Sequence, residues 1–265
     1  MIKANTKTKV KSSISLPSVK DMLEAGVHFG HETKRWNPNY SKYIFKKRDK
    51  FHIIDLEKTL GNFEKALDFI SKKAETGNIL IVGTKRQARD IVKEESIRCG
   101  VHYVVNRWVG GLMTNFSIIN KSIKKLHLIE SKLDGDLKGL SQQQLSVLRR
   151  EWARFDRIFN GVKYLEKIPD VMIIIDPKFE RIALKEARTV KMPVVAIVDS
   201  NTDPKLIDYP IPANDDAIKS IQLFMRYIAD TILKANKGKG VKYVLRDYSY
   251  VGIKKEDQKK VSGKK

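Results

Sequence analysis

The chain has 265 residues, 42% of them hydrophobic, and its 52 Lys and Arg against 31 Asp and Glu give a formal net charge of +21. Such a composition supports a folded core and excludes a chain that is disordered throughout. The single cysteine, Cys99, excludes a disulfide framework and a cysteine-based metal site, and it agrees with a reducing compartment. So positive a surface requires a polyanion to neutralise it, and nucleic acid is the usual one.

The two ends of the chain are basic and poor in apolar residues. Residues 1–18 are rich in Lys, Ser and Thr without an acid, which is typical of an arm that orders on RNA, with an organellar transit peptide as the alternative. Residues 236–265 form a basic tail, too poor in apolar residues to fold alone. The longest apolar runs, Val171–Ile175 and Pro193–Val198, are too short to cross a bilayer, so we expect no membrane partner.

Short apolar segments alternate with helical periodicity through most of the chain. A helix is predicted from Ser18 to Glu24, because Ser18 and Asp21 have the spacing of a capping box. The strand-like segments that follow are Ile53–Leu56, Ile79–Val82, Val101–Val105, Val171–Ile175 and Val194–Val198. This alternation predicts an α/β fold: a doubly wound, mostly parallel sheet with helices on both faces, spanning residues 19–116 and 168–235.

The alternation breaks at residues 117–167, where no strand is expected. Apolar residues from Ile119 to Leu133 have helical spacing, and those from Leu145 to Val162 alternate in steps of 3 and 4, as in a coiled-coil seam. We therefore predict an inserted antiparallel coiled-coil helical hairpin. Two core helices packed flat on the sheet are the alternative, and the charged faces of both helices favour the projecting form.

Patterns for catalysis are weak. The segment Ile79–Arg86 is a strand, a turn and a helix start, where backbone N–H groups attract phosphate. The two-glycine phosphate loop and the GxGxxG turn are both absent, and no nucleophile–base–acid set stands out. A nucleotide-dependent enzyme that uses the turn at Gly83 is the alternative to a non-catalytic protein.

Carboxylates follow the strand that ends at Val198, at the edge where α/β sheets place functional loops. With a histidine they have the chemistry to hold Mg²⁺ or Zn²⁺. The alternative role of the carboxylates is to cap helices and form hydrogen bonds in turns. The alternative role of His28 and His31 is packing and hydrogen bonding within the fold. No cofactor is required, and the residues predicted for a possible metal ion are Asp199, Asp203, Asp215 and His28.

Signals for RNA binding are stronger together than singly. Arg pairs with phosphates through two N–H groups, and an aromatic ring stacks on an unpaired base. For each cluster alone, a solvated run of charge beside a buried Trp is an equal explanation. The predicted RNA contacts are Arg35, Trp36, Lys46, Lys47, Arg48, Lys85, Arg86, Arg89, Arg107, Asn115, Lys124, Lys125, Arg149 and Arg150.

Several segments carry a specific resemblance when they are taken in order. They are Leu23–His31, Arg35–Pro38, His52–Leu56, Val82–Ala88, Arg107–Phe116, Pro193–Asp199 and Ile207–Ala217. Together they resemble the family of the second protein of the bacterial small ribosomal subunit, over about residues 19 to 235.

The resemblance implies an α/β domain with a protruding coiled-coil hairpin and no catalytic activity. It implies a structural protein of cytoplasmic ribosomes, bound to small-subunit ribosomal RNA (rRNA) between head and body, with organellar ribosomes of bacterial descent as an alternative. Its implied partners are neighbouring small-subunit proteins, including the large mRNA-binding protein whose docking the family supports, and we expect no homo-oligomer. A free regulatory RNA-binding protein is the remaining alternative.

Overall fold

The computed structural model describes residues 15–244 apart from positions 76, 136 and 138, together with Arg246 and Tyr248. Most of the predicted N-terminal arm (residues 1–18) and much of the predicted tail (236–265) therefore lie outside the described residues. Among the helices of the described part, none is long and apolar enough to cross a membrane.

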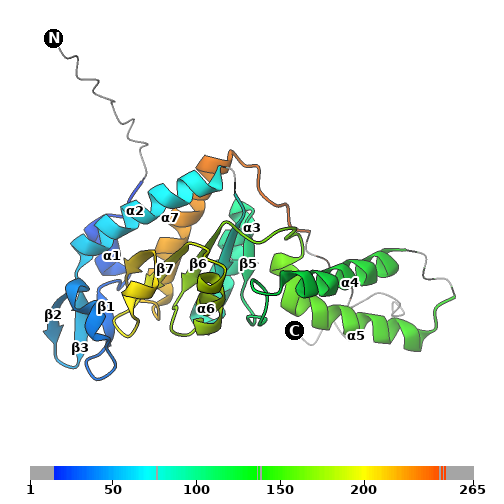
Figure 1. The fold of residues 1–265 in the computed structure, drawn as a ribbon, viewed down its shortest axis with the longest axis horizontal. Coiled ribbons are helices and arrows are strands. Elements are labelled where there is room, and N and C mark those ends of the chain that lie inside the picture. Colours follow the sequence, from blue (N-terminus) through cyan, green and yellow to red (C-terminus); the bar gives the residue numbers. More distant parts are fainter. Residues whose placement is uncertain are drawn as a thin grey trace, which may run out of the picture.

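A five-stranded parallel sheet forms the centre of the molecule (Figure 1). Its order is β5 (His102–Val104), β4 (Ile79–Val82), β6 (Val171–Ile175), β7 (Val194–Val198) and β8 (Tyr209–Pro212). The chain adds β5 on one side of β4 and the later strands on the other side. The order of winding therefore reverses between β4 and β6, and α/β proteins place binding sites outside the carboxyl ends of the strands at such a point.

Both faces of this sheet are covered by helices, as predicted. Ile79 and Ile81 belong to the apolar layer formed with α2 (Leu56–Ala74), α3 (Arg86–Cys99) and α7 (Ile218–Asn236). Leu80 and Val82 belong to the opposite layer, which includes α6 (Arg181–Thr189). Because successive strand residues point to opposite faces, an uninterrupted apolar strand requires this two-sided cover, and the α/β class is confirmed.

A second, antiparallel sheet lies beside the first, with the order β1 (Phe29–Glu32), β3 (Phe51–Ile54), β2 (Ile44–Arg48). The interpretation of Ile53–Leu56 as a strand of the main sheet was therefore wrong. Its first residues belong to β3, and Leu56 begins α2 because Asp55 caps that helix by accepting a hydrogen bond from the backbone N–H of Glu57. The sequence also missed β8, whose two prolines are tolerated at the edge of a sheet.

The fold also contains one short α-helix and three 3-10 helices among the described residues. Helix α1 (Val19–Glu24) begins at the predicted capping box, in which Ser18 and Asp21 bond reciprocally. Three 3-10 helices complete the connections: η1 (Pro38–Tyr43), η2 (Asn160–Val162) and η3 (Pro204–Leu206).

Helices α4 (Phe116–Asp134) and α5 (Gln142–Phe159) occupy the segment in which no strand was expected. They lie side by side and extend away from the sheet beyond β5 (Figure 1). Apolar residues of both helices, among them Ile123, Leu126 and Trp152, are buried in one continuous cluster with one layer of the main sheet. A capping box between Ser141 and Gln144 begins α5, as predicted.

The described residues after α7 return along the body toward these two helices (Figure 1). The backbone N–H of Val241 donates to the carbonyl oxygen of Gly100 at 2.8 Å. Farther along, Tyr248 packs edge-on against Trp152, with ring centroids 4.9 Å apart. This part of the predicted tail therefore forms specific contacts with the folded body.

Candidate nucleic-acid interface

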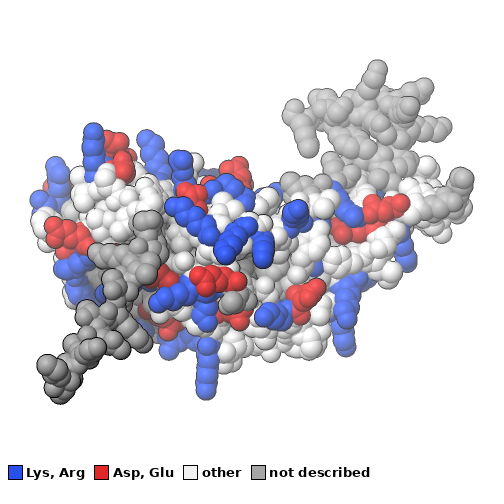
Figure 2. All heavy atoms as spheres, turned by 90° about the horizontal axis from the view of Figure 1, so that it is seen from above, with Lys and Arg blue, Asp and Glu red and all other residues white. Residues whose placement is uncertain are grey.

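The predicted RNA contacts are spread along the molecule rather than gathered in one pocket. Arg35, Trp36 and the cations of β2 lie at the end that carries the small sheet, whereas α4 and α5 hold four of the predicted cations at the other end (Figure 1). Figure 2 shows Lys and Arg side chains along the length of one face, with Asp and Glu between them. Most of the predicted contacts are exposed, and Lys85, Arg89 and Arg149 are partly buried.

The small sheet combines exposed cations with exposed aromatic rings. Trp36 is 38% exposed, and its ring centroid lies 5.1 Å from that of His52. Phe29, Phe45 and Phe51 are also exposed. This end of the molecule therefore offers both charge and apolar surface to a partner.

The loop between β5 and α4 carries Arg107 and Asn115 on its surface and is anchored by a buried carboxylate. Oε1 of Glu186, on α6, accepts hydrogen bonds from the indole N–H of Trp108 at 3.0 Å and the backbone N–H of Gly111 at 2.7 Å. Its Oε2 accepts one from the backbone N–H of Met113 at 3.0 Å. Burial alone would raise the pKa of Glu186, but these hydrogen bonds lower it below its ordinary value.

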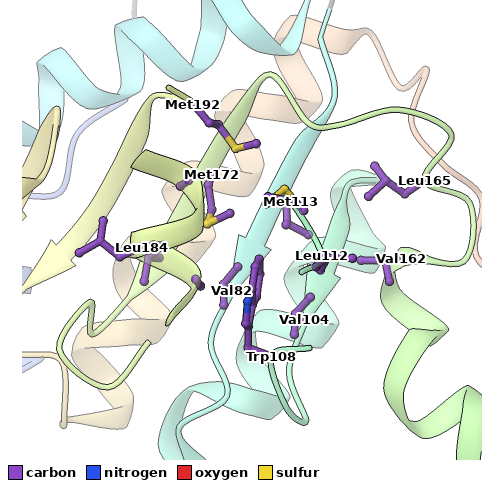
Figure 3. Close-up of a cluster of buried hydrophobic side chains, with 14 of the residues drawn as sticks. Val82, Val104, Trp108, Leu112, Met113, Val162, Leu165, Met172, Leu184 and Met192 are labelled. Carbon is purple, nitrogen blue, oxygen red and sulfur yellow. The ribbon is translucent and has the colours of Figure 1, made fainter. Parts of the chain in front are cut away.

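Apolar packing holds the same loop from below. Trp108, Leu112 and Met113 are buried in the layer that contains Val82 and Val104 (Figure 3). The loop is thus fixed to the sheet and to α6 at once. Sequence reasoning missed Glu186. Its helical spacing from Ala183, three positions before it on the buried face of α6, could have indicated that it is buried.

In the turn after β4, the polar groups of Thr84 and the ammonium of Lys85 are already bound within the protein. The backbone N–H and the hydroxyl of Thr84 both donate to Oε1 of Glu180 at 2.6 Å, where a phosphate would have to bind. The Lys85 ammonium lies 2.8 Å from Asp176, 3.0 Å from Asp215 and 2.5 Å from Asp216. Burial alone would lower the pKa of Lys85, but these three carboxylates raise it, so its charge is neutralised within the protein.

A cluster of possible metal ligands lies beside Lys85. We call it the carboxylate cluster, and it consists of His31, Asp199, Asp215 and Asp216, whose ligand atoms all lie within 4.8 Å of one another. Nδ1 of His31 lies 2.9 Å from Oδ2 of Asp199, and its Nε2 lies 3.5 Å from Oδ2 of Asp216. The pKa of His31 is raised, chiefly by the hydrogen bond to Asp199.

Asp215 is the most constrained member of the carboxylate cluster. It is fully buried, and its Oδ2 has no hydrogen-bond partner among the described residues. Burial, together with the neighbouring charges of Asp176 and Asp199, raises the pKa of Asp215 well above its ordinary value. A buried carboxylate oxygen without a partner fits a cation ligand.

Two of the four residues predicted for a metal lie outside the carboxylate cluster. Asp203 caps η3 by accepting a hydrogen bond from the backbone N–H of Lys205 at 3.0 Å, and it also accepts one from the Asn39 amide. The ring of His28 packs on Phe29, with centroids 4.1 Å apart. The structure therefore brings Asp199 and Asp215 together in the carboxylate cluster, which does not include Asp203 or His28.

The hairpin cations differ in their surroundings. Lys125 pairs with Glu151 at 2.5 Å and lies over the ring of Phe155. Lys124 is exposed and forms no ion pair with any described residue. The guanidinium of Arg150 donates to the carbonyl oxygen of Ser146, and that of Arg149 donates to the hydroxyl of the same residue.

Comparisons with known proteins agree with one another. The model of the family described as ribosomal protein S2 matches residues 22–235. Two curated relatives, both named small ribosomal subunit protein uS2, come from two strains of Treponema pallidum, one of which is the Nichols strain. Each is 44% identical to the chain over 233 residues, which cover 87% of this chain and 80% of the relative.

Proposed function

Because the chain belongs to the ribosomal protein S2 family, whose members are structural proteins of the small ribosomal subunit and not enzymes, we propose that it binds small-subunit rRNA at the junction of head and body. The observation that carries the proposal is the unpaired basic surface. Arg35, Arg48 and Arg107 are exposed, and none of them pairs with a carboxylate among the described residues. Cations left unpaired by the protein are free to neutralise phosphates.

The way in which the protein would organise RNA follows from the distance between its phosphate contacts. Arg35 lies in the loop after β1, which is bonded to Ser200 through the backbone N–H of Asn37, and Arg107 lies in the loop that Glu186 anchors. A protein that holds phosphates at separated, fixed points fixes the relative orientation of the RNA segments that carry them. Lys85 has no part in this binding, because its ammonium is held by the carboxylates around it.

Helices α4 and α5 serve in this proposal as an inserted coiled-coil arm. Their apolar residues pack between the helices, whereas Lys124 and Arg150 face the solvent. Such an arm brings cations to RNA that lies away from the sheet. The spacing of apolar residues in α5 and the direction of both helices in Figure 1 support this role.

The large mRNA-binding protein of the small subunit docks, in this proposal, on the apolar surface at the small sheet. Val19, Leu23 and Phe45 are exposed there beside a cavity of about 400 Å³. Phosphates would leave these side chains in water, whereas a protein segment would bury them. The segment that docks there is therefore apolar.

A metal ion in the carboxylate cluster is a separate proposal. Four carboxylates, those of Asp176, Asp199, Asp215 and Asp216, surround one ammonium and one imidazole, which leaves the group net negative. The unpartnered Oδ2 of Asp215 supplies an open ligand. Since one ligand is a histidine nitrogen, Zn²⁺ fits better than Mg²⁺. The ion would stabilise the contact between β1 of the small sheet and the loop after β7 of the main sheet.

Charge reversal tests the assignment of RNA contacts. The double variant Arg35→Glu and Arg107→Glu should fold normally and enter small subunits poorly, because two phosphate contacts become repulsions. The matched control is Lys65→Glu with Lys72→Glu, two exposed lysines on α2. Incorporation is measured by quantifying each chain in purified subunits, and normal incorporation of a folded Arg35 and Arg107 variant overturns the assignment.

A further inference from the structure

A groove lies between α6 and the segment Asn201–Leu206, next to the carboxylate cluster, because Asn201 lines the groove and its amide nitrogen lies 2.8 Å from Nε2 of His31. It includes a cavity of about 730 Å³. A second cavity of about 340 Å³ shares Arg188 and Leu206 with the first. We call the two together the basic groove.

Cations outnumber carboxylates in the lining of the basic groove, which includes Asp203 and Asp208. Its exposed cations are Lys178, Arg181, Lys185, Arg188, Lys191 and Lys205. None of these six forms an ion pair with a described residue. Six cations against two carboxylates leave the groove with an excess of positive charge.

The acidic residues on the same elements offset only part of this charge, and each of them has a role in the fold. Glu180 and Glu186 are buried, and they accept hydrogen bonds from Thr84 and Trp108. Asp203 is held by the Asn39 amide and the start of η3. Asp208 accepts a hydrogen bond from the backbone N–H of Val194. Each carboxylate is thus committed to a fold contact.

Hydrogen bonds connect each wall of the basic groove to a loop that carries a predicted RNA contact. On one side, the backbone N–H of Asn37 donates to the carbonyl oxygen of Ser200 at 2.7 Å, which fixes the Arg35 loop beside the segment Asn201–Leu206. On the other side, Glu186 of α6 holds the loop that carries Arg107. The groove therefore lies between Arg35 and Arg107 and continues the surface assigned to RNA.

We propose that the basic groove binds an unpaired stretch of small-subunit rRNA, with phosphates on its cations and a base against its apolar floor. The floor consists of Leu184, Leu206 and Pro177. A concave groove of this size admits a splayed nucleotide, whereas a duplex presents paired bases and a convex backbone. The inference rests on the proposed function, since it extends the same RNA-binding surface.

The first test is a pair of charge reversals. In Arg181→Glu with Lys185→Glu, neither lost side chain forms a hydrogen bond within the described residues, so the fold should survive. We expect at least about a tenfold loss of subunit binding, and a fall of about two in the slope of log affinity against log salt concentration. The control again is Lys65→Glu with Lys72→Glu, which makes the same charge change on the other face of the sheet.

The outcomes separate this inference from the proposed function. If the wild-type chain does not bind subunits, the proposed function fails. If wild type, control and groove variant bind alike, with unchanged salt dependence, the groove assignment alone is overturned. Circular dichroism and thermal unfolding establish that the variants are folded.

A second readout identifies the occupant directly. Thr189 is exposed and lines the larger cavity, so a photoreactive p-benzoylphenylalanine at that position reports on what fills the groove. In assembled subunits, we expect illumination to join the chain to rRNA, at a position that lies outside a base-paired helix. Crosslinking only to a protein, or only to paired RNA, overturns the proposal.

Discussion

The indole N–H of Trp108 donates a 3.0 Å hydrogen bond to Oε1 of Glu186, and this contact joins the loop after β5 to α6. Trp108 and Glu186 are 78 positions apart in the chain, and both are buried. The loop presents Arg107, and α6 presents one wall of the basic groove. A single carboxylate therefore sets the spacing between two parts of the surface assigned to RNA.

Glu186→Ala should destabilise the fold by at least about 3 kcal/mol, because several buried N–H donors lose their acceptor. Glu186→Gln keeps the shape but turns an amide toward those donors, so we expect a loss of about 1–3 kcal/mol. Urea unfolding measures both, with the exposed Glu166→Gln as the control. Equal stability of Glu186→Gln and wild type would contradict this account of the loop.

The same carboxylate predicts a pH dependence. Its pKa is lowered in the folded chain, so its contribution to stability is complete above the unfolded pKa and is lost as the pH falls through the folded pKa. Between about pH 5 and pH 3, wild type should lose more stability than Glu186→Gln. Thermal unfolding across this range measures the difference, and parallel curves are the contrary result.

The carboxylate cluster predicts one bound Zn²⁺ per chain. After exposure to Zn²⁺ and dialysis, the variants His31→Ala and Asp215→Asn should retain much less metal than the wild-type chain. Metal binding should persist in His28→Ala and Asp203→Asn, since these residues contact other groups. Free Zn²⁺ at a hundred times its dissociation constant should stabilise wild type by about 3 kcal/mol. A wild-type chain that retains no metal, or unchanged binding in His31→Ala, contradicts the site.

The contacts of Tyr248 indicate that the segment after α7 stabilises helices α4 and α5. The hydroxyl of Tyr248 donates to Oδ1 of Asp134 at 2.5 Å, and its ring covers Trp152. Tyr248→Ala should speed amide hydrogen exchange in α4 and α5 while leaving the main sheet unchanged. Tyr248→Phe, which keeps the ring, should have a smaller effect. Equal exchange in the hairpin of Tyr248→Ala and wild type would count against this role.

Replacing Gly61 or Gly161 by alanine should change the free energy of unfolding in opposite directions. A Cβ at Gly161 would overlap the carbonyl oxygen of Tyr103, so Gly161→Ala should destabilise the fold by at least about 2 kcal/mol. A Cβ at Gly61, which is exposed on α2, would meet nothing within 4 Å. Gly61→Ala should therefore stabilise by about 0.5–1 kcal/mol, because alanine favours the helix. Denaturant midpoints compare the two, and a tolerated Gly161→Ala contradicts the close approach.

The strength of local signals explains which parts of the fold could be predicted. Strands β4, β6 and β7 have the predicted bounds, because runs of buried Ile and Val are distinctive. Strand β8 escaped prediction, since Pro210 and Pro212 are tolerated only at a sheet edge, which the sequence does not reveal. The segment Ile53–Leu56 looked like the others, but a short apolar run does not specify its sheet.

The candidate sites depended more on tertiary structure. His31 and Asp199 are 168 positions apart and meet only because β1 lies against the loop after β7. The choice between His28 and His31 therefore could not come from the sequence. Lys85 was assigned to RNA from its position beside Arg86, but its buried surroundings in the folded chain give it three carboxylate partners.

The central claim, that this chain is held in the small subunit by phosphate contacts, is tested most directly by sucrose-gradient sedimentation of a cell lysate. The chain is followed by blotting at moderate and then at high salt. Sedimentation with the small subunit at moderate salt and release at high salt is the expected result, because phosphate contacts weaken as counterions accumulate. A chain that stays at the top of the gradient at both salt concentrations would contradict the claim.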